Sequence, residues 1–236
     1  MASLYLNSAL SVAVVGDTVS LEGEDAKHAV TVARTRVGER LAIGNGRGLI
    51  VRGEVTSLSP FELLADSVSE DPPASPELWL VQALAKGDRD ELAIQAATEL
   101  GVSGVIPWSA ERSITKWEGA KAEKGRERWE SIVREASKQS IRSWVPVVEP
   151  LIATKQLRGA LLVLEPTATT ALTEVALPGD GRISLVVGPE GGISPRELAL
   201  LEESGATLVR LGSEVLRTST AGPAAIAVLN ARLGRW

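Results

Sequence analysis

After residue 76, short apolar runs alternate with segments that carry helix signals. Two helix starts are marked by Asp88-Arg89-Asp90-Glu91 and Ser194-Pro195-Arg196-Glu197, in each of which glutamate follows a capping residue by three positions. An Ala-rich helix is expected over residues 224–233. The apolar runs, each short enough for one buried strand, are Leu78–Leu84, Val102–Pro107, Leu161–Leu164, Ile183–Val187 and Thr207–Leu211. This alternation predicts an α/β domain with a parallel sheet and helices on its faces.

The first part of the chain has a different pattern. Apolar runs separated by turn signals predict strands at Val12–Val15, Arg40–Ile43, Leu49–Val55 and Phe61–Leu64, and one short helix is expected at Glu24–Thr35. Many short strands within this first part of the chain favour a small barrel. The proline-rich segment Asp71–Pro76 predicts an extended linker. We therefore expect two domains, residues 1–72 and 73–236.

Composition excludes several kinds of chemistry. The chain has no cysteine and one histidine, His28, so disulfides, zinc fingers, thiol nucleophiles and histidine-rich metal sites are ruled out within one chain, and no metal is expected. We interpret His28 as structural. The net charge of −5 does not favour nucleic acid as a partner. No run is long and apolar enough for a membrane span, and no basic residue precedes Lys27 as in a signal peptide, so the cytoplasm is the expected location.

Two loops are candidates for a ligand site because each follows a predicted strand and precedes a predicted helix. The loop Gly188–Gly192, with sequence GPEGG, follows one strand, and Leu211–Gly222 follows another. Ligands of open α/β sheets bind at the carboxyl ends of the strands. Neither loop matches the phosphate-binding patterns GK[ST] or GxGxxG. The alternatives are a tight strand-to-helix connection for the first loop, and helix-capping Ser and Thr with a surface Arg217 for the second.

Two other features admit a structural explanation. The glycine cluster Gly44–Gly48 precedes an apolar strand, which predicts a hairpin turn rather than a phosphate cradle. Residues 111–142 interleave basic side chains with Trp117 and Trp129, and Trp144 follows. That combination can bind RNA, but an amphipathic helix with inward-facing tryptophans is the alternative. We expect the tryptophans to be buried and some of the arginines to contact RNA.

Several segments together resemble one family in their order and spacing. They are Gln82–Val102, Ile106–Trp117, Arg128–Pro146, Leu185–Leu198 and Leu211–Gly222, with a weaker match over Lys27–Glu39. The set is similar to the small-subunit (16S) ribosomal RNA uridine-N3 methyltransferases, the RsmE family of the SPOUT class. The resemblance implies a PUA-like barrel followed by a parallel sheet with a C-terminal trefoil knot. It also implies a homodimer that binds S-adenosylmethionine and methylates 16S rRNA, within the assembled small ribosomal subunit, as part of ribosome biogenesis.

The resemblance also implies which residues form the site. Cofactor-binding residues are expected at Leu164, Glu165, Val187, Gly188, Pro189, Glu190, Gly191, Gly192, Leu211, Gly212, Leu216, Arg217, Thr218, Ser219, Thr220 and Ala221. Arg217 is the first catalytic candidate, as a cation that positions uracil and stabilises charge on its oxygen, and Glu190 is the second, as a proton acceptor. RNA contacts are expected at Arg34, Lys86, Arg112, Lys116, Arg134 and Arg142, with the last five on one basic face.

The sequence departs from the family pattern at three places. Ser219 stands where most relatives have glutamate, Glu214 where arginine is common, and Ser3-Leu4 precede Tyr5 without the usual basic residue. The alternatives to the family's activity are another SPOUT RNA methyltransferase, such as a ribose methyltransferase, and a non-catalytic rRNA-binding or assembly factor. A generic nucleotide-binding enzyme is disfavoured by the absence of Walker A and GxGxxG loops.

Overall fold

The computed structural model describes residues 4–236, so the expectation at Ser3 lies outside the described residues. The chain forms two compact units. The first contains residues 4–73 together with Ser137–Val145, and the second contains Ala74–Ala136 and Pro146–Trp236. The first break thus falls within the proline-rich segment, whereas the return of residues 137–145 to the first unit was not foreseen from the sequence.

The first unit is built on a curled sheet, with five strands among its described residues in the order β1-β3-β4-β5-β2. Strand β1 is parallel to β3, and the other neighbours are antiparallel. The inward residues, among them Tyr5, Ile43, Val51 and Leu63, form a buried core. The strands are β1 (Leu4–Leu6), β2 (Thr18–Leu21), β3 (Arg40–Gly44), β4 (Leu49–Leu58) and β5 (Phe61–Glu70). The expected hairpin at Gly44–Gly48 joins β3 to β4.

Two predictions for this unit were wrong. Val12–Val15 is irregular rather than a strand, and three of its valines are exposed; the strand lies further on, in β2, where β5 provides a pairing partner. The expected single helix over Glu24–Thr35 is divided into α1 (Gly23–Lys27) and a π-helical turn η1 (His28–Val32). Arg34 then adopts φ 55°, a left-handed conformation that ends the helical run.

Side-chain contacts hold residues 137–145 in the first unit. Lys138 Nζ lies 2.7 Å from Asp25 Oδ1, and both side chains are almost fully buried. The Trp144 indole N–H donates to the Asp71 carbonyl oxygen at 2.9 Å, and Trp144 forms an isolated bridge with Arg47. These partners are distant in sequence, so local patterning carried no sign of them.

The second unit is a parallel sheet, as the alternating pattern predicted. Among the described residues it has seven strands, in the order β12-β10-β11-β6-β7-β8 with β9 also paired to β7. The strands are β6 (Glu77–Ala83), β7 (Gly104–Ser109), β8 (Val147–Val148), β9 (Ile152–Ala153), β10 (Ala160–Leu164), β11 (Arg182–Val187) and β12 (Thr207–Val209). Leu164 pairs with Val209 and Val187 with Gln82, so the carboxyl ends of these strands meet at one edge.

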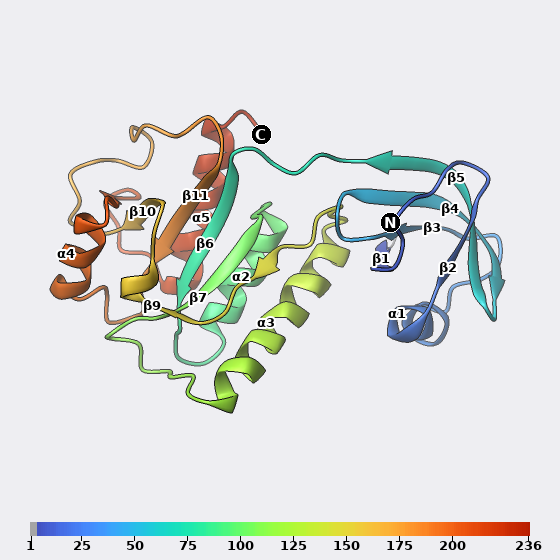
Figure 1. The fold of residues 1–236 in the computed structure, drawn as a ribbon, viewed down its shortest axis with the longest axis horizontal. Helices are drawn as coiled ribbons and strands as arrows, with labels where there is room; N and C mark the ends of the chain where they lie inside the picture. Colours follow the sequence, from blue (N-terminus) through green and yellow to red (C-terminus); the bar gives the residue numbers. More distant parts are fainter. Residues whose placement is uncertain (1–3) are drawn as a thin grey trace. The chain divides into compact units, whose positions relative to one another are not determined.

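Helices cover both faces of this sheet (Figure 1). They are α2 (Arg89–Glu99), α3 (Ala120–Gln139), the 3₁₀ turn η2 (Thr154–Gln156), α4 (Pro195–Glu203) and α5 (Thr218–Arg232). Residues of β6 alternate between the two faces: Trp79 and Val81 pack with Leu201 of α4, while Leu80 faces Gly222 of α5. In the part of the chain that is described, no helix has the length and apolarity to cross a membrane.

The helix signals were right in one case and partly wrong in the other. Ser194 caps α4, and its hydroxyl and the Glu197 carboxylate exchange hydrogen bonds with each other's backbone N–H groups at 3.2 Å. Asp88 precedes α2 but makes no side-chain capping bond; Asp90 instead accepts from the Ala85 N–H at 3.2 Å. Trp129 is buried, as expected, and packs edge-on against Trp117, but Trp117 and Trp144 are only half-buried, so the prediction that all three are buried was wrong for these two.

Candidate functional site

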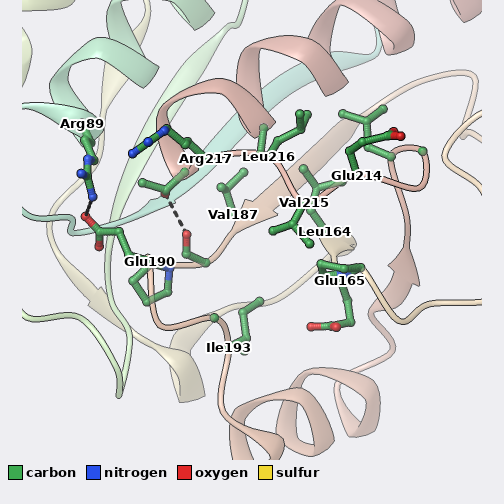
Figure 2. A pocket seen from close by; sticks show the side chains of 18 residues that line it. Arg89, Leu164, Glu165, Val187, Glu190, Ile193, Glu214, Val215, Leu216 and Arg217 are labelled. Carbon is green, nitrogen blue, oxygen red and sulfur yellow. Dashed lines mark hydrogen bonds and ion pairs between the residues drawn. The ribbon is translucent and has the colours of Figure 1, made fainter.

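A cavity of about 360 Å³ lies in the second unit, at the carboxyl ends of β10, β11 and β12 (Figure 2). The loops that follow these strands form its walls, together with the start of α5 and one side chain from α2. Its lining residues are Arg89, Leu164, Glu165, Pro166, Val187, Gly188, Pro189, Glu190, Gly192, Ile193, Leu211, Gly212, Glu214, Val215, Leu216, Arg217, Thr218 and Ala221. The volume is within the range of small-molecule sites.

Most of the expected cofactor-binding residues line this cavity, although they come from three separate stretches of sequence. Gly191, Ser219 and Thr220 are outside the lining. The lining residues outside the expected set are Arg89, Pro166, Ile193, Glu214 and Val215. Val215 is apolar and 77% exposed. It lies between the predicted Gly212 and Leu216 in the sequence, and this position could have identified it as a cavity residue.

The glycines of this site have different local reasons. A Cβ on Gly188 would lie 2.7 Å from Ile193 Cγ1, so this glycine allows the loop to fold closely on itself. Gly192 and Gly212 have φ values of +71° and +83°, which favour glycine over residues with a side chain. The loop geometry therefore accounts for these three glycines before any ligand is considered.

Thr218 connects three elements beneath the cavity. Its hydroxyl donates to the Gly188 carbonyl oxygen and accepts from the Gln82 side-chain amide, each at 2.8 Å. Gln82 is fully buried at the end of β6. The alternative that the Ser and Thr residues here cap the helix is not supported, because Arg217 occupies the capping position without a side-chain bond. Thr218 fixes the beginning of α5 relative to the loop after β11.

Arg217 is exposed at the cavity, directly before α5. Its guanidinium makes no hydrogen bond or ion pair with any residue in the described range 4–236. Its five N–H donors are therefore available to a ligand. This geometry agrees with the role expected for a cation that contacts an anionic or carbonyl-bearing group.

Glu190 is in a different situation. Its carboxylate Oε1 accepts from Arg89 Nη1 at 2.9 Å and from the Lys86 N–H at 3.0 Å. Partial burial would raise the pKa of this carboxyl, but hydrogen bonds from backbone N–H groups and from Arg89 outweigh burial, and the pKa is lowered from its ordinary value. A carboxylate held in this way is a weak proton acceptor, so the contacts favour a structural role for Glu190.

The cavity offers both apolar walls and free hydrogen-bond donors. Leu164, Val187 and Leu216 supply apolar surface. The backbone N–H groups of Leu211, Gly212 and Leu216 donate to no group within residues 4–236. Apolar walls with a few convergent polar groups are typical of sites for small organic ligands. Planar, partly polar groups such as adenine fit this donor set, so the cavity fits the cofactor that the resemblance implies.

Two of the expected RNA-contacting residues, Lys86 and Arg112, bond the GPEGG loop, and Lys116 bonds a residue near Arg112 in the sequence. The Lys86 N–H bonds Glu190, Arg112 Nη1 donates to the Gly191 carbonyl oxygen at 3.0 Å, and Lys116 Nζ donates to the Ala110 carbonyl oxygen at 3.1 Å. Lys86, Arg112 and Lys116 are all exposed.

The other expected RNA contacts are distributed elsewhere. Arg134 lies within α3, in the second unit. Arg34 is exposed in the first unit, where Arg142 also lies. Burial lowers the pKa of Arg142 to about 10, so its environment does not favour a phosphate contact. The structure brings Lys86 and Arg112 to the same loop, whereas Arg142 belongs to the first unit, and the shared basic face stays a prediction.

Comparison with known proteins gives a consistent result. A family model described as RNA methyltransferase domain matches residues 72–230, and one described as RNA methyltransferase PUA domain matches residues 21–65. The Mycobacterium bovis protein named ribosomal RNA small subunit methyltransferase E is 40% identical over 94% of this chain and 89% of its own length. The Bacillus subtilis protein of that name is 32% identical, with 86% of each chain covered.

A solved structure is similar over nearly the whole chain. It is the ribosomal RNA small subunit methyltransferase E of Neisseria gonorrhoeae bound to S-adenosyl methionine. The two chains are 28% identical, 98% of each is covered, and the TM-score is 0.84. The likeness includes both units, so the PUA-like and methyltransferase parts of this chain have the same order as in that protein.

Proposed function

The chain belongs to the family of ribosomal RNA small subunit methyltransferases E, and from this premise we propose that it methylates N3 of one uridine in 16S rRNA with S-adenosylmethionine as methyl donor. The observation that carries the proposal is the cavity at the strand ends, which is lined by apolar side chains, by residues with free backbone N–H groups and by the unpaired Arg217. The proposal is supported by the position of the cavity among the same three loops that the resemblance assigns to the methyl donor.

The residues of the cavity fit the methyl donor. Leu164, Val187 and Leu216 would pack against its adenine, and the N–H groups of Leu211 and Gly212 would donate to its polar edge. When bound, S-adenosylmethionine supplies an electrophilic methyl group on a positively charged sulfur. The carboxylates of Glu165 and Glu214 line the same cavity, and the charge of the donor favours this acidic surrounding.

Arg217 would act on the uracil. N3 must lose its proton, which passes to solvent water, to become a nucleophile, and negative charge then develops on the neighbouring carbonyl oxygens. A guanidinium beside one of these oxygens stabilises that charge and holds the ring in position. Orientation contributes as well, because alignment of two bound groups can supply an effective molarity on the order of 10⁵ M. Since N3 is on the pairing edge of the base, the target uridine must be unpaired or flipped out.

The finer points of the proposal rest on the family resemblance. We expect the second unit to contain a C-terminal trefoil knot, and the enzyme to be a cytoplasmic homodimer that acts on the assembled small subunit. Trp236, 67% exposed after the apolar helix α5, supports a subunit interface near the C-terminus. The exposed side chains of Lys86 and Arg112, which lie at the GPEGG loop, support RNA binding beside the cavity despite the net charge of −5.

A methyl-transfer assay tests this function. Small ribosomal subunits from a strain that lacks the modification are incubated with radiolabelled S-adenosylmethionine, digested to nucleosides and analysed by mass spectrometry. We expect labelled N3-methyluridine with wild-type protein. Cofactor binding without transfer to any rRNA substrate would support the non-catalytic alternative, and a methylated ribose would indicate another SPOUT reaction.

A further inference from the structure

The GPEGG loop is held from outside by a side chain that sequence reasoning assigned only to a helix start. Arg89, in the first turn of α2, reaches the cavity and its Nη1 lies 2.9 Å from Glu190 Oε1 (Figure 2). The same oxygen accepts from the Lys86 N–H at 3.0 Å. One carboxylate oxygen thus connects the loop after β11 to the segment that joins β6 to α2.

That segment is itself well anchored. The Ala85 N–H donates to Asp90 Oδ2 at 3.2 Å, and the Ala85 carbonyl oxygen accepts from the Thr115 hydroxyl at 2.6 Å. Asp90 is 4% exposed, so this attachment is shielded from water. Residues 85–90 therefore form a fixed support for Arg89 and for the Lys86 N–H.

The loop, in contrast, has few restraints of its own. Three of its five residues are glycines. Glycine loses more conformational entropy on ordering than other residues do, so this loop is costly to order. Within the loop the Gly192 N–H donates to the Pro189 carbonyl oxygen at 2.9 Å, and from outside Thr218 bonds the Gly188 carbonyl oxygen and Arg112 the Gly191 carbonyl oxygen. Two restraints act through a side chain of the loop, the bond from the Lys86 N–H and the charge-assisted bond from Arg89, both to Glu190 Oε1.

We propose that Arg89 is a positioning residue that holds the methyl-donor loop in its binding conformation through the Glu190 carboxylate. Glu190 then serves as the attachment point of the loop and takes no proton from the uracil. The inference rests on the proposed function, because it assigns the loop to binding of the methyl donor. It goes beyond that function by naming a residue of α2 that acts through another side chain.

A double-mutant cycle tests the proposal. Binding of S-adenosylmethionine is measured by titration calorimetry for wild type, Arg89→Ala, Glu190→Ala and the double variant. We expect each single substitution to raise the Kd roughly tenfold, and the double variant to be no weaker than the weaker single variant. Arg89→Lys should recover part of the affinity. The thermal midpoint should change little, because the ion pair is partly exposed and such pairs contribute little to stability.

Glu190→Gln separates positioning from proton transfer. This side chain keeps an oxygen that can accept from Arg89 and Lys86 but cannot act as a carboxylate base. We expect the Kd for S-adenosylmethionine to rise less than in Glu190→Ala, and the pH profile of kcat at saturating donor to keep the shape of the wild-type profile. The control is Arg128→Ala, which removes another arginine that pairs with α2, through Glu91 at 2.9 Å and outside the cavity lining, and which should leave the Kd unchanged.

Two results would overturn the inference while wild-type binding is intact. The first is additive loss, with the double variant about a hundredfold weaker, because Arg89 would then act independently of Glu190. The second is a fall in kcat of Glu190→Gln by a hundredfold or more, the range expected for loss of a general base. A wild-type protein that binds no S-adenosylmethionine would overturn the proposed function and this inference with it.

Discussion

Asp90 is a carboxylic acid buried at the start of α2, and we predict that its burial makes the stability of the protein depend on pH. Desolvation raises the pKa of Asp90 from 3.8 to about 6, against the opposing effect of backbone hydrogen bonds from Ala85 and Glu91. The folded protein therefore binds this proton more tightly than the unfolded chain. Stability contributed by the protonated acid is lost as pH rises from about 4 to about 6, and above that range the ionised group costs about 3 kcal/mol.

The substitution Asp90→Asn keeps the shape of the side chain and an oxygen to accept from Ala85. The quantity to compare is the free energy of unfolding of the variant minus that of wild type. This difference should rise by about 2.5 kcal/mol between pH 4 and pH 7 and then stay level. Denaturant unfolding at a series of pH values measures this difference. Tryptophan fluorescence is a suitable signal, because Trp79, Trp108 and Trp129 are buried in the same unit as Asp90. A difference that does not vary with pH would refute the argument.

Three further predictions concern activity and folding. Arg217→Ala should lower kcat by roughly a hundredfold or more with a small change in the Kd for S-adenosylmethionine, as measured by single-turnover kinetics and calorimetry; an unchanged kcat would exclude Arg217 from the chemistry. Asp25→Ala should destabilise the first unit by about 3 kcal/mol in denaturant unfolding, because it removes the carboxylate that contacts the buried Lys138; a loss below about 1 kcal/mol would contradict this. Ser194→Ala should cost about 1 kcal/mol by removing the bond to the Glu197 N–H, whereas Ser194→Thr should retain most of it in the same assay.

Local patterns predicted those parts of the fold that local chemistry determines. The capping box at Ser194 and Glu197 marks the start of α4, and the apolar runs mark β6, β10 and β11 within one or two residues. Val12–Val15 has the composition of a strand but no partner strand, and strand formation depends on pairing more than on propensity. The placement of residues 137–145 in the first unit depends on partners far along the chain, such as Asp25 for Lys138.

In the candidate site, too, local sequence predicted some residues, whereas others depend on contacts between distant parts of the chain. The loops after β11 and β12 could be identified because they follow strand ends, where ligands bind in such sheets. Arg89 could not, because its contact with Glu190 spans 101 positions in the sequence and its neighbours read as a capping pattern. The role of Glu190 depended on that contact. A carboxylate in a glycine-rich loop resembles a proton acceptor until its partners are known.

Mapping of the modified nucleotide tests the central claim most directly. A methyl group on N3 blocks the pairing edge of uracil, so reverse transcriptase stops beside it. In a strain that lacks N3-methyluridine in its 16S rRNA, expression of this protein should restore a stop at one uridine, and the Arg217→Ala variant at equal abundance should not. Folded wild-type protein that binds S-adenosylmethionine but restores no stop in 16S rRNA would contradict the account.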